Sequence, residues 1–266
     1  MEKFQKYCLS LLILVVYSNI QAQVNCNAVE GKDCKKACEL HNYWGEYQGS
    51  RESQEGFDEA IKLCPNFSNA YMEKAVPYLK NGDFVTWKIL IDKAVSISPE
   101  KYLGYRGWCK YQFLRDYKGA IADIEALEKI YPTGYLGYSA NGDYELHIAK
   151  AICYSALGQK EKAISIIENQ LAKKEHNIGL FDYYQLGVTY FELSKYDKAL
   201  ENFEKQSKQN DFAENIYFKS KVAKIRNKDY LDLKKMALKS YDEGKTMKDG
   251  YTHHFNKVYR TQIEEL

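Results

Sequence analysis

Residues 68–99 read SNAYMEKAVPYLKNGDFVTWKILIDKAVSISP, and the architecture of the chain can be worked out from this stretch. Apolar residues recur at helical spacing on either side of residues 81–83, which predicts two amphipathic helices joined by a tight turn. Pro99 closes the stretch, with Pro65 lying 34 residues before it and Pro132 lying 33 residues after it. A period of this length indicates stacked helical hairpins, because one hairpin cannot bury its apolar face alone.

The same stretch closely resembles the tetratricopeptide repeat (TPR). In that family a large residue opens the first helix, a small residue at the eighth position lets the two helices approach, and a proline ends the unit. These three positions and the other characteristic positions of the repeat are occupied here by Tyr71, Ala75, Tyr78, Phe84, Trp87, Ile91, Ala94 and Pro99. The resemblance implies an all-α fold, a right-handed α-solenoid of five to six TPR-like helix-turn-helix repeats.

Further units follow at the same phase along the chain. The strongest short match is DYKGAI at 116–121, whereas residues 133–143 contain glycines and interrupt the phase as an inserted loop. We expect repeat units near 34–67, 68–100, 101–133, 144–179, 180–213 and 214–248. Residues 249–266 are expected to form a C-terminal capping helix, with a frayed tail as the alternative.

The N-terminal residues have the layout of a secretory signal. Lys3 and Lys6 precede an apolar run at 9–17, and Ala22 provides a small residue at the expected cleavage point. The apolar run is well short of the roughly 20 residues of a spanning helix, so an uncleaved anchor is less favoured, and no later segment resembles a membrane span. We therefore expect a signal peptide at 1–22, a cysteine-containing arm at 23–33, and an exported, periplasmic or secreted protein.

The charge balance narrows the class of partner. The chain has 38 Lys and Arg residues and 36 Asp and Glu residues. A nucleic-acid-binding protein would show a basic excess or a basic face, so nucleic acid is not expected as a partner. Many Glu, Lys, Ala and Leu residues and only four prolines fit water-soluble helices instead.

Six cysteines lie beyond the expected signal, which suits disulfides in an exported chain. Because the two helices of a repeat are antiparallel, Cys64 at the end of the first unit should lie near Cys34 and Cys38 at its start. We expect Cys64 to bridge one of these two and Cys26 to bridge the other, with a metal site as the rival interpretation. Cys109 and Cys153 are left open between a further bridge and buried free thiols.

The first helix of each TPR faces a concave groove, and the family resemblance assigns partner-binding positions there. The groove residues expected from it are aromatic: Tyr102, Tyr105, Phe113, Phe181, Tyr184, Phe191 and Phe218. Aromatic side chains dominate binding hot spots, although the same residues could instead pack the first helices against one another. Only Lys35 and Asn42 would suit a clamp for a peptide carboxylate, so such a clamp is disfavoured.

Catalytic and cofactor signatures are not apparent in the sequence. The five histidines lack ligand spacing, and the adjacent His253 and His254 suggest a solvated pair. No nucleophile motif or phosphate-binding loop stands out, so we expect neither an enzyme nor a cofactor. The sequence favours a scaffold that holds a segment of an envelope or secreted protein, and the alternative is a module that binds glycan or peptidoglycan through its tyrosines.

Overall fold

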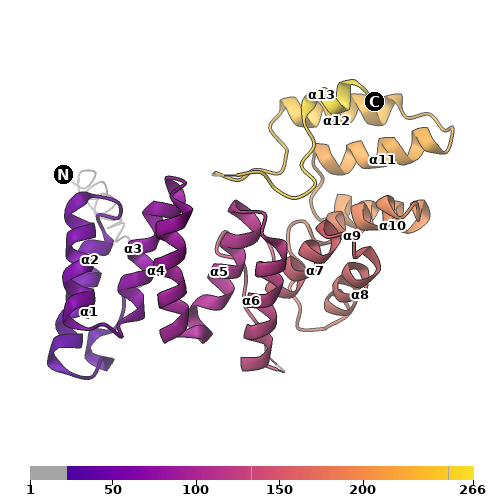
Figure 1. Ribbon diagram of the computed structural model, residues 1–266. Helices are drawn as coiled ribbons and strands as arrows, with labels where there is room; N and C mark the ends of the chain where they lie inside the picture. Colours follow the sequence, from indigo (N-terminus) through magenta and orange to yellow (C-terminus); the bar gives the residue numbers. More distant parts are fainter. Residues whose placement is uncertain (1–22, 133, 251) are drawn as a thin grey trace, which may run out of the picture. The chain divides into compact units, whose positions relative to one another are not determined.

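The computed structural model describes residues 23–132, 134–250 and 252–266, and this part of the chain is built from helices (Figure 1). A short 3₁₀ helix, η1 (Cys26–Ala28), precedes the α-helices. The expected signal peptide at 1–22 lies outside the described residues. The helices follow one another as α1 (Lys32–Gly45), α2 (Arg51–Leu63), α3 (Ser68–Lys80), α4 (Phe84–Ile97), α5 (Pro99–Phe113), α6 (Tyr117–Ile130), α7 (Leu146–Ala156), α8 (Lys160–Leu171), α9 (Asp182–Glu192), α10 (Tyr196–Gln209), α11 (Ala213–Ile225), α12 (Leu231–Asp242) and α13 (Arg260–Glu264). The prediction of an all-α array of repeated helix pairs is confirmed.

Short polar residues fix the start of several second helices. The side chain of Asp83 accepts a hydrogen bond from the backbone N–H of Thr86 at 3.0 Å, and Asp116 accepts one from Gly119 at 2.8 Å. Such N-caps satisfy backbone donors that have no partner within the helix. Pro99 occupies the first turn of α5, where its missing N–H costs nothing.

The chain divides into two compact units after Pro77, which lies inside α3. In the first unit the core is formed by Ala37 of α1, Ala60 of α2 and Phe67, all buried. Two disulfides, Cys34–Cys64 and Cys26–Cys38, flank this core. They are one of the two sets of bridges that the sequence left open, and they tie the arm before α1 and the end of α2 to the first helix.

The second unit, from Tyr78 onward, is a succession of packed helices. Each helix from α4 to α12 contacts the next one in the chain, and the first helices α5, α7 and α9 also contact one another in order. Residues 134–145 form the connection between α6 and α7. An isolated antiparallel bridge joins Tyr138 to Glu145, and Gly142 adopts a positive φ of 78° in the turn between them.

The two remaining cysteines are not bridged. Cys109 and Cys153 are free and fully buried, so the alternative of a further bridge between them is wrong. Burial raises the pKa of both thiols far above the ordinary range, since a thiolate is poorly stabilised among apolar neighbours. Neither sulfur is suited to act as a nucleophile.

Within the described residues, no helix combines the length and the apolar character needed to cross a bilayer.

The contact between α9 and α10 requires a residue without a side chain. A Cβ atom placed on Gly187 would lie 2.5 Å from Cε1 of Phe203, whose ring is fully buried. We expect Gly187→Ala to lower the free energy of unfolding by about 1–3 kcal/mol, because a ring in a packed core cannot move aside without straining its neighbours. Urea denaturation followed by circular dichroism would measure the change.

Gly45→Ala is the matched control, since Gly45 is also helical and a Cβ there meets no atom within 4 Å. The control should leave stability unchanged or raise it, through the better helix propensity of alanine. An equal loss in both variants would contradict the steric explanation.

The disulfides should contribute unequally to the stability of the first unit. Cys34 and Cys64 are 30 residues apart, and Cys26 and Cys38 are 12 residues apart. Loop-closure entropy predicts a loss of about 3–4 kcal/mol for Cys34→Ser with Cys64→Ser, and of about 3 kcal/mol for the other double variant. Denaturation under non-reducing conditions would compare the two. A larger loss for the shorter loop would contradict this order.

Candidate protein-binding surfaces

The seven aromatic residues expected to bind a partner differ in accessibility. Tyr102 and Phe181 are 8% exposed and Tyr184 is fully buried, whereas the other four are half-buried. A fully buried ring cannot supply contact area to a partner without a rearrangement. In this structure Tyr102, Phe181 and Tyr184 therefore serve the core, which was the alternative interpretation of these positions. The half-buried residues are Tyr105, Phe113, Phe191 and Phe218.

Two of the half-buried rings meet on α9 and α11. The centroids of Phe191 and Phe218 are 5.2 Å apart, and Tyr196 at the start of α10 lies 5.6 Å from Phe191. The ammonium of Lys221 lies over Phe191 at 5.1 Å and over Phe218 at 5.7 Å. We call these four residues, Phe191, Tyr196, Phe218 and Lys221, the aromatic patch. It combines apolar area with a cation held by the ring faces.

A second aromatic group lies on α5. Trp108 is 5.7 Å from Tyr105 and 5.3 Å from Phe113, measured between ring centroids. Trp108 occupies the slot that usually holds a small residue, and it is largely buried. The structure thus brings Tyr105 and Phe113 together through Trp108, and it brings Phe191 and Phe218 together directly.

The C-terminal residues before α13 lie along the first helices of unit 2. We call residues 247–250 and 252–258 the strap. Its backbone carbonyls accept side-chain hydrogen bonds: Tyr184 donates to Asn256 at 2.5 Å, Gln185 to Phe255 at 3.3 Å, and Arg115 to His253 at 2.7 Å. The side chains that hold the strap through its backbone carbonyls therefore come from α9 and from the turn after α5.

One strap side chain is inserted between two others. The ring of Phe255 lies 5.7 Å from Tyr111 of α5 and 5.6 Å from Tyr117 of α6, with the guanidinium of Arg115 over it at 5.6 Å. Phe255 is 8% exposed. This insertion holds the middle of the strap in place by burial of apolar area.

The start and end of the strap meet at a buried carboxylate of α11. Glu214 accepts hydrogen bonds from the ammonium of Lys257 at 2.6 Å and from the backbone N–H of Met247 at 3.2 Å. Burial raises the pKa of Glu214, and the neighbouring Lys257 opposes this effect. After the strap, α13 packs against α12.

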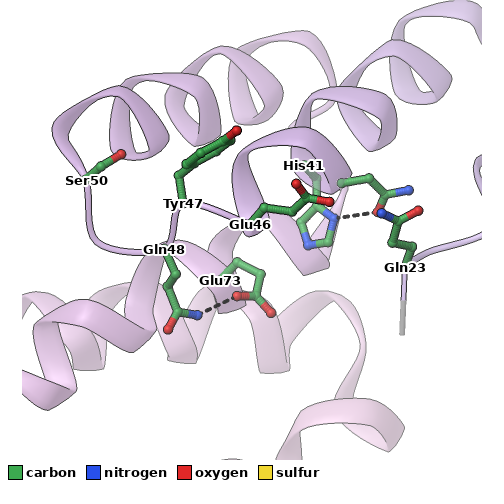
Figure 2. A pocket seen from close by; sticks show the side chains of 9 residues that line it. Gln23, His41, Glu46, Tyr47, Gln48, Ser50 and Glu73 are labelled. Carbon is green, nitrogen blue, oxygen red and sulfur yellow. Dashed lines mark hydrogen bonds between the residues drawn. The ribbon is translucent and has the colours of Figure 1, made fainter. Parts of the chain in front are cut away.

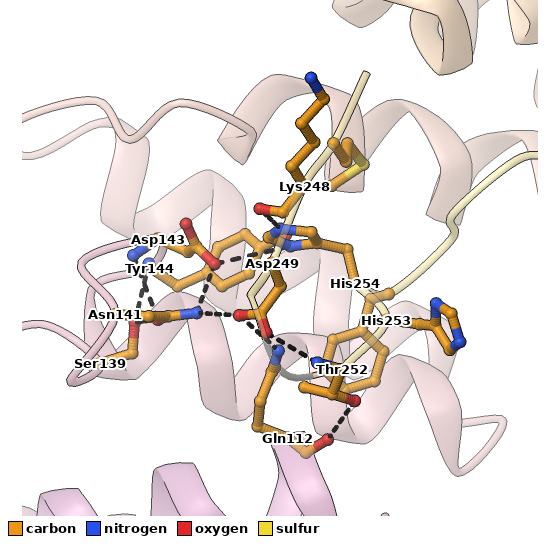
Figure 3. Close-up of polar contacts among 12 residues, drawn as sticks. Gln112, Ser139, Asn141, Asp143, Tyr144, Lys248, Asp249, Thr252, His253 and His254 are labelled. Atoms are coloured by element: carbon orange, nitrogen blue, oxygen red, sulfur yellow. Dashed lines mark hydrogen bonds and ion pairs between the residues drawn. The ribbon is translucent and has the colours of Figure 1, made fainter. Parts of the chain in front are cut away.

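The centre of the strap contributes to a polar cluster with the loop before α7 (Figure 3). Nδ1 of His254 lies 3.5 Å from a carboxylate oxygen of Asp143, and ligand atoms of His254, Asp143 and Asp249 all lie within 4.8 Å of one another. Desolvation raises the pKa of Asp143, His254 lowers it and Asp249 raises it. His254 is 5% exposed while His253 is exposed, so the expectation of a solvated pair is wrong for His254.

Unit 1 has a hollow of its own, with a volume of about 710 Å³ beside the end of α1 (Figure 2). Gln48 donates a hydrogen bond to Glu73 at 2.8 Å, and His41 and Asn42 also line the hollow. The amide of Asn42 pairs with both backbone groups of Val24, at 2.8 and 3.1 Å. Asn42 is thus engaged by the N-terminal arm.

The strap is the feature that sequence reasoning missed. Its buried apolar residues, Met247, Phe255 and Val258, are separated by polar and glycine residues and follow neither the helical nor the strand period. The available signal was the presence of such residues in an otherwise polar tail. It indicates that the tail is buried somewhere, but it does not indicate against what.

Comparisons with known proteins agree with this architecture. The model of the tetratricopeptide repeat family matches residues 183–210. No curated protein sequence matches the chain. Among solved structures, PilW, a widely conserved type IV pilus biogenesis factor, is 17% identical with a TM-score of 0.59, covering 80% of this chain and 96% of PilW.

Two further structures have similar scores. PilF of Pseudomonas aeruginosa is 11% identical with a TM-score of 0.58, and the match covers 78% of this chain and 93% of the PilF chain. A tetratricopeptide repeat protein from Parabacteroides merdae is 15% identical with a TM-score of 0.56, and covers 86% and 82% respectively. At these identities the likeness concerns the fold. Residues 183–210 therefore match the tetratricopeptide repeat family, and the chain shares the helix-pair fold of these structures.

Proposed function

We propose that this protein is an exported scaffold that binds an extended segment of an envelope or secreted protein on the first-helix face of unit 2. The observation that carries the proposal is the strap. A stretch of the chain itself lies against α5, α9 and α11 and is held there by side chains that donate to its backbone carbonyls. The face thus has the chemistry to hold a non-helical segment.

The aromatic patch is the part of this face proposed for the partner. It begins beside the strap, since Tyr184 bonds the strap and its ring lies 5.9 Å from Phe218. Half-buried aromatic rings lose little side-chain entropy on binding and give a large contact area. The ammonium of Lys221 adds a preference for a carboxylate near an apolar residue of the partner.

Two observations support an exported location. The bridges Cys34–Cys64 and Cys26–Cys38 suit an oxidising compartment, where disulfides persist. Residues 1–22 have the sequence layout of a secretory signal. One of the similar folds, PilW, is described as a type IV pilus biogenesis factor, which fits a partner in the cell envelope.

The alternative ligand is a glycan of the cell wall. Tyrosine rings and hydroxyls suit sugar surfaces, and Tyr43 and Tyr47 of unit 1 are 58% and 52% exposed. Tyr47 also lines the hollow beside the end of α1, whose other lining groups are mostly polar. A glycan would accordingly be captured through unit 1 and not through the aromatic patch.

Site-specific photocrosslinking tests the partner surface. A photoreactive phenylalanine analogue replaces Phe191 in one protein and the exposed Lys228 in the matched control. After irradiation in producing cells, we expect one defined protein attached at position 191 and none at 228, and Lys221→Glu in the first protein should reduce the yield several-fold. Mass spectrometry of the adduct identifies the partner segment, and circular dichroism verifies that each variant is folded.

The same experiment separates the alternatives. Equal labelling at both positions, or no protein adduct at position 191, would contradict the assignment to the aromatic patch. Retention of the unmodified protein on insoluble cell-wall polymer, lost on Tyr47→Ala, would support the glycan alternative.

A further inference from the structure

The polar cluster at the centre of the strap has an unusual histidine. Nε2 of His254 lies 2.7 Å from the carbonyl oxygen of Lys248, so Nε2 carries a proton and donates it to that carbonyl. Nδ1 is buried and has no hydrogen-bond partner. It points toward the carboxylates of Asp143 and Asp249 (Figure 3).

This arrangement is that of a metal ligand. A histidine that binds a metal usually donates its other ring N–H to a carbonyl or a carboxylate, which fixes the tautomer and directs the free lone pair at the ion. A lone pair directed at two carboxylates is unfavourable unless a positive charge lies between them. The oxygen of Asp143 lies 3.5 Å from Nδ1, which is longer than the roughly 2.8 Å of a charge-assisted hydrogen bond.

The spacing suits a shared ion. Two ligands at 2.0–2.2 Å from one tetrahedral ion lie about 3.4 Å apart, close to the distance between Nδ1 of His254 and Asp143. In the described part of the chain, these three residues are the group of potential ligands whose donor atoms gather within 4.8 Å. His254 and Asp143 are held at 1% and 15% side-chain exposure, so the ligands are shielded from water.

Neighbouring amides orient both carboxylates. Nδ2 of Asn141 donates to Asp143 at 2.5 Å and to Asp249 at 3.2 Å, and Nε2 of Gln112 donates to Asp249 at 3.3 Å. The other oxygen of Asp249 accepts from the backbone N–H of Thr252 at 2.8 Å. Partners of this kind position metal ligands in known sites.

We propose that His254, Asp143 and Asp249 form a binding site for a divalent cation that accepts nitrogen and oxygen ligands together, Zn²⁺ or Mn²⁺. Ca²⁺ and Mg²⁺ prefer oxygen ligands throughout and fit the set less well. Two ligands come from the strap and one from the loop before α7, so the ion joins the strap to the face on which it lies. The site does not involve the aromatic patch and stands independently of the proposed partner.

Binding of the ion is tested on the full exported chain without a polyhistidine tag, stripped of metal by chelator. Isothermal titration with Zn²⁺, Mn²⁺, Ca²⁺ and Mg²⁺ should show one site for Zn²⁺ or Mn²⁺ and weaker binding of the other two. His254→Ala and Asp143→Asn should each lower the affinity about tenfold or more. His253→Ala is the matched control, since His253 is adjacent and exposed, and it should bind as the parent does.

Hydrogen exchange on the parent protein gives a readout that needs no variant. Saturating Zn²⁺ or Mn²⁺ should slow exchange of strap amides, including that of Thr252, about tenfold, while amides of α1 and α2 in unit 1 stay unchanged. Absence of a binding isotherm for both ions, equal affinity in the His254→Ala variant, or unaltered strap exchange at saturation would each overturn the proposal. If a variant loses its helical circular dichroism, its binding result is set aside and hydrogen exchange on the parent protein decides the test.

Discussion

Close packing of successive helices is the constraint on which the fold of unit 2 depends. At Gly187 the neighbouring ring of Phe203 leaves no space for a Cβ atom, so α9 and α10 meet backbone against ring. A pair packed this tightly still leaves one face of each helix uncovered. That face is buried by the next pair, and helices α4 to α12 accordingly follow one another in unbroken contact. The repeat period in the sequence is a consequence of this stacking.

Polar side chains on the first-helix face explain how an irregular segment can be buried there. An extended chain has backbone carbonyls without partners, and burying them unpaired is costly. Tyr184, Gln185 and Arg115 donate to three of these carbonyls in the strap. These donors bind the main chain of the strap, so they place few demands on its side chains. Tyr184 belongs both to the core and to the contact with the strap, since its ring is fully buried while its hydroxyl donates to a strap carbonyl.

Unit 1 secures its N-terminal arm by different means. The arm has few apolar residues, and it is held by the bridge from Cys26 to Cys38 and by the paired hydrogen bonds of Asn42 with Val24. Covalent attachment replaces the apolar area that a longer element would bury. Both ends of the described chain are thus fastened by specific contacts, through disulfides in unit 1 and through polar groups in unit 2.

The sequence alone determined the all-α repeat fold and the position of the helix turns, and it narrowed the bridges of four cysteines to two possible sets, because all three follow from local spacing. The structure shows which of the two sets forms. Capping residues such as Asp83 and Asp116, and small residues such as Gly187, act within a single helix pair. Tertiary structure decided which groove aromatics are buried, and it decided the fate of the C-terminal residues. Contacts of the strap with α5 and α9 join residues 70 to 140 positions apart, as between Phe255 and Gln185 or Thr252 and Gln112, and contacts at such separation leave no period in the sequence.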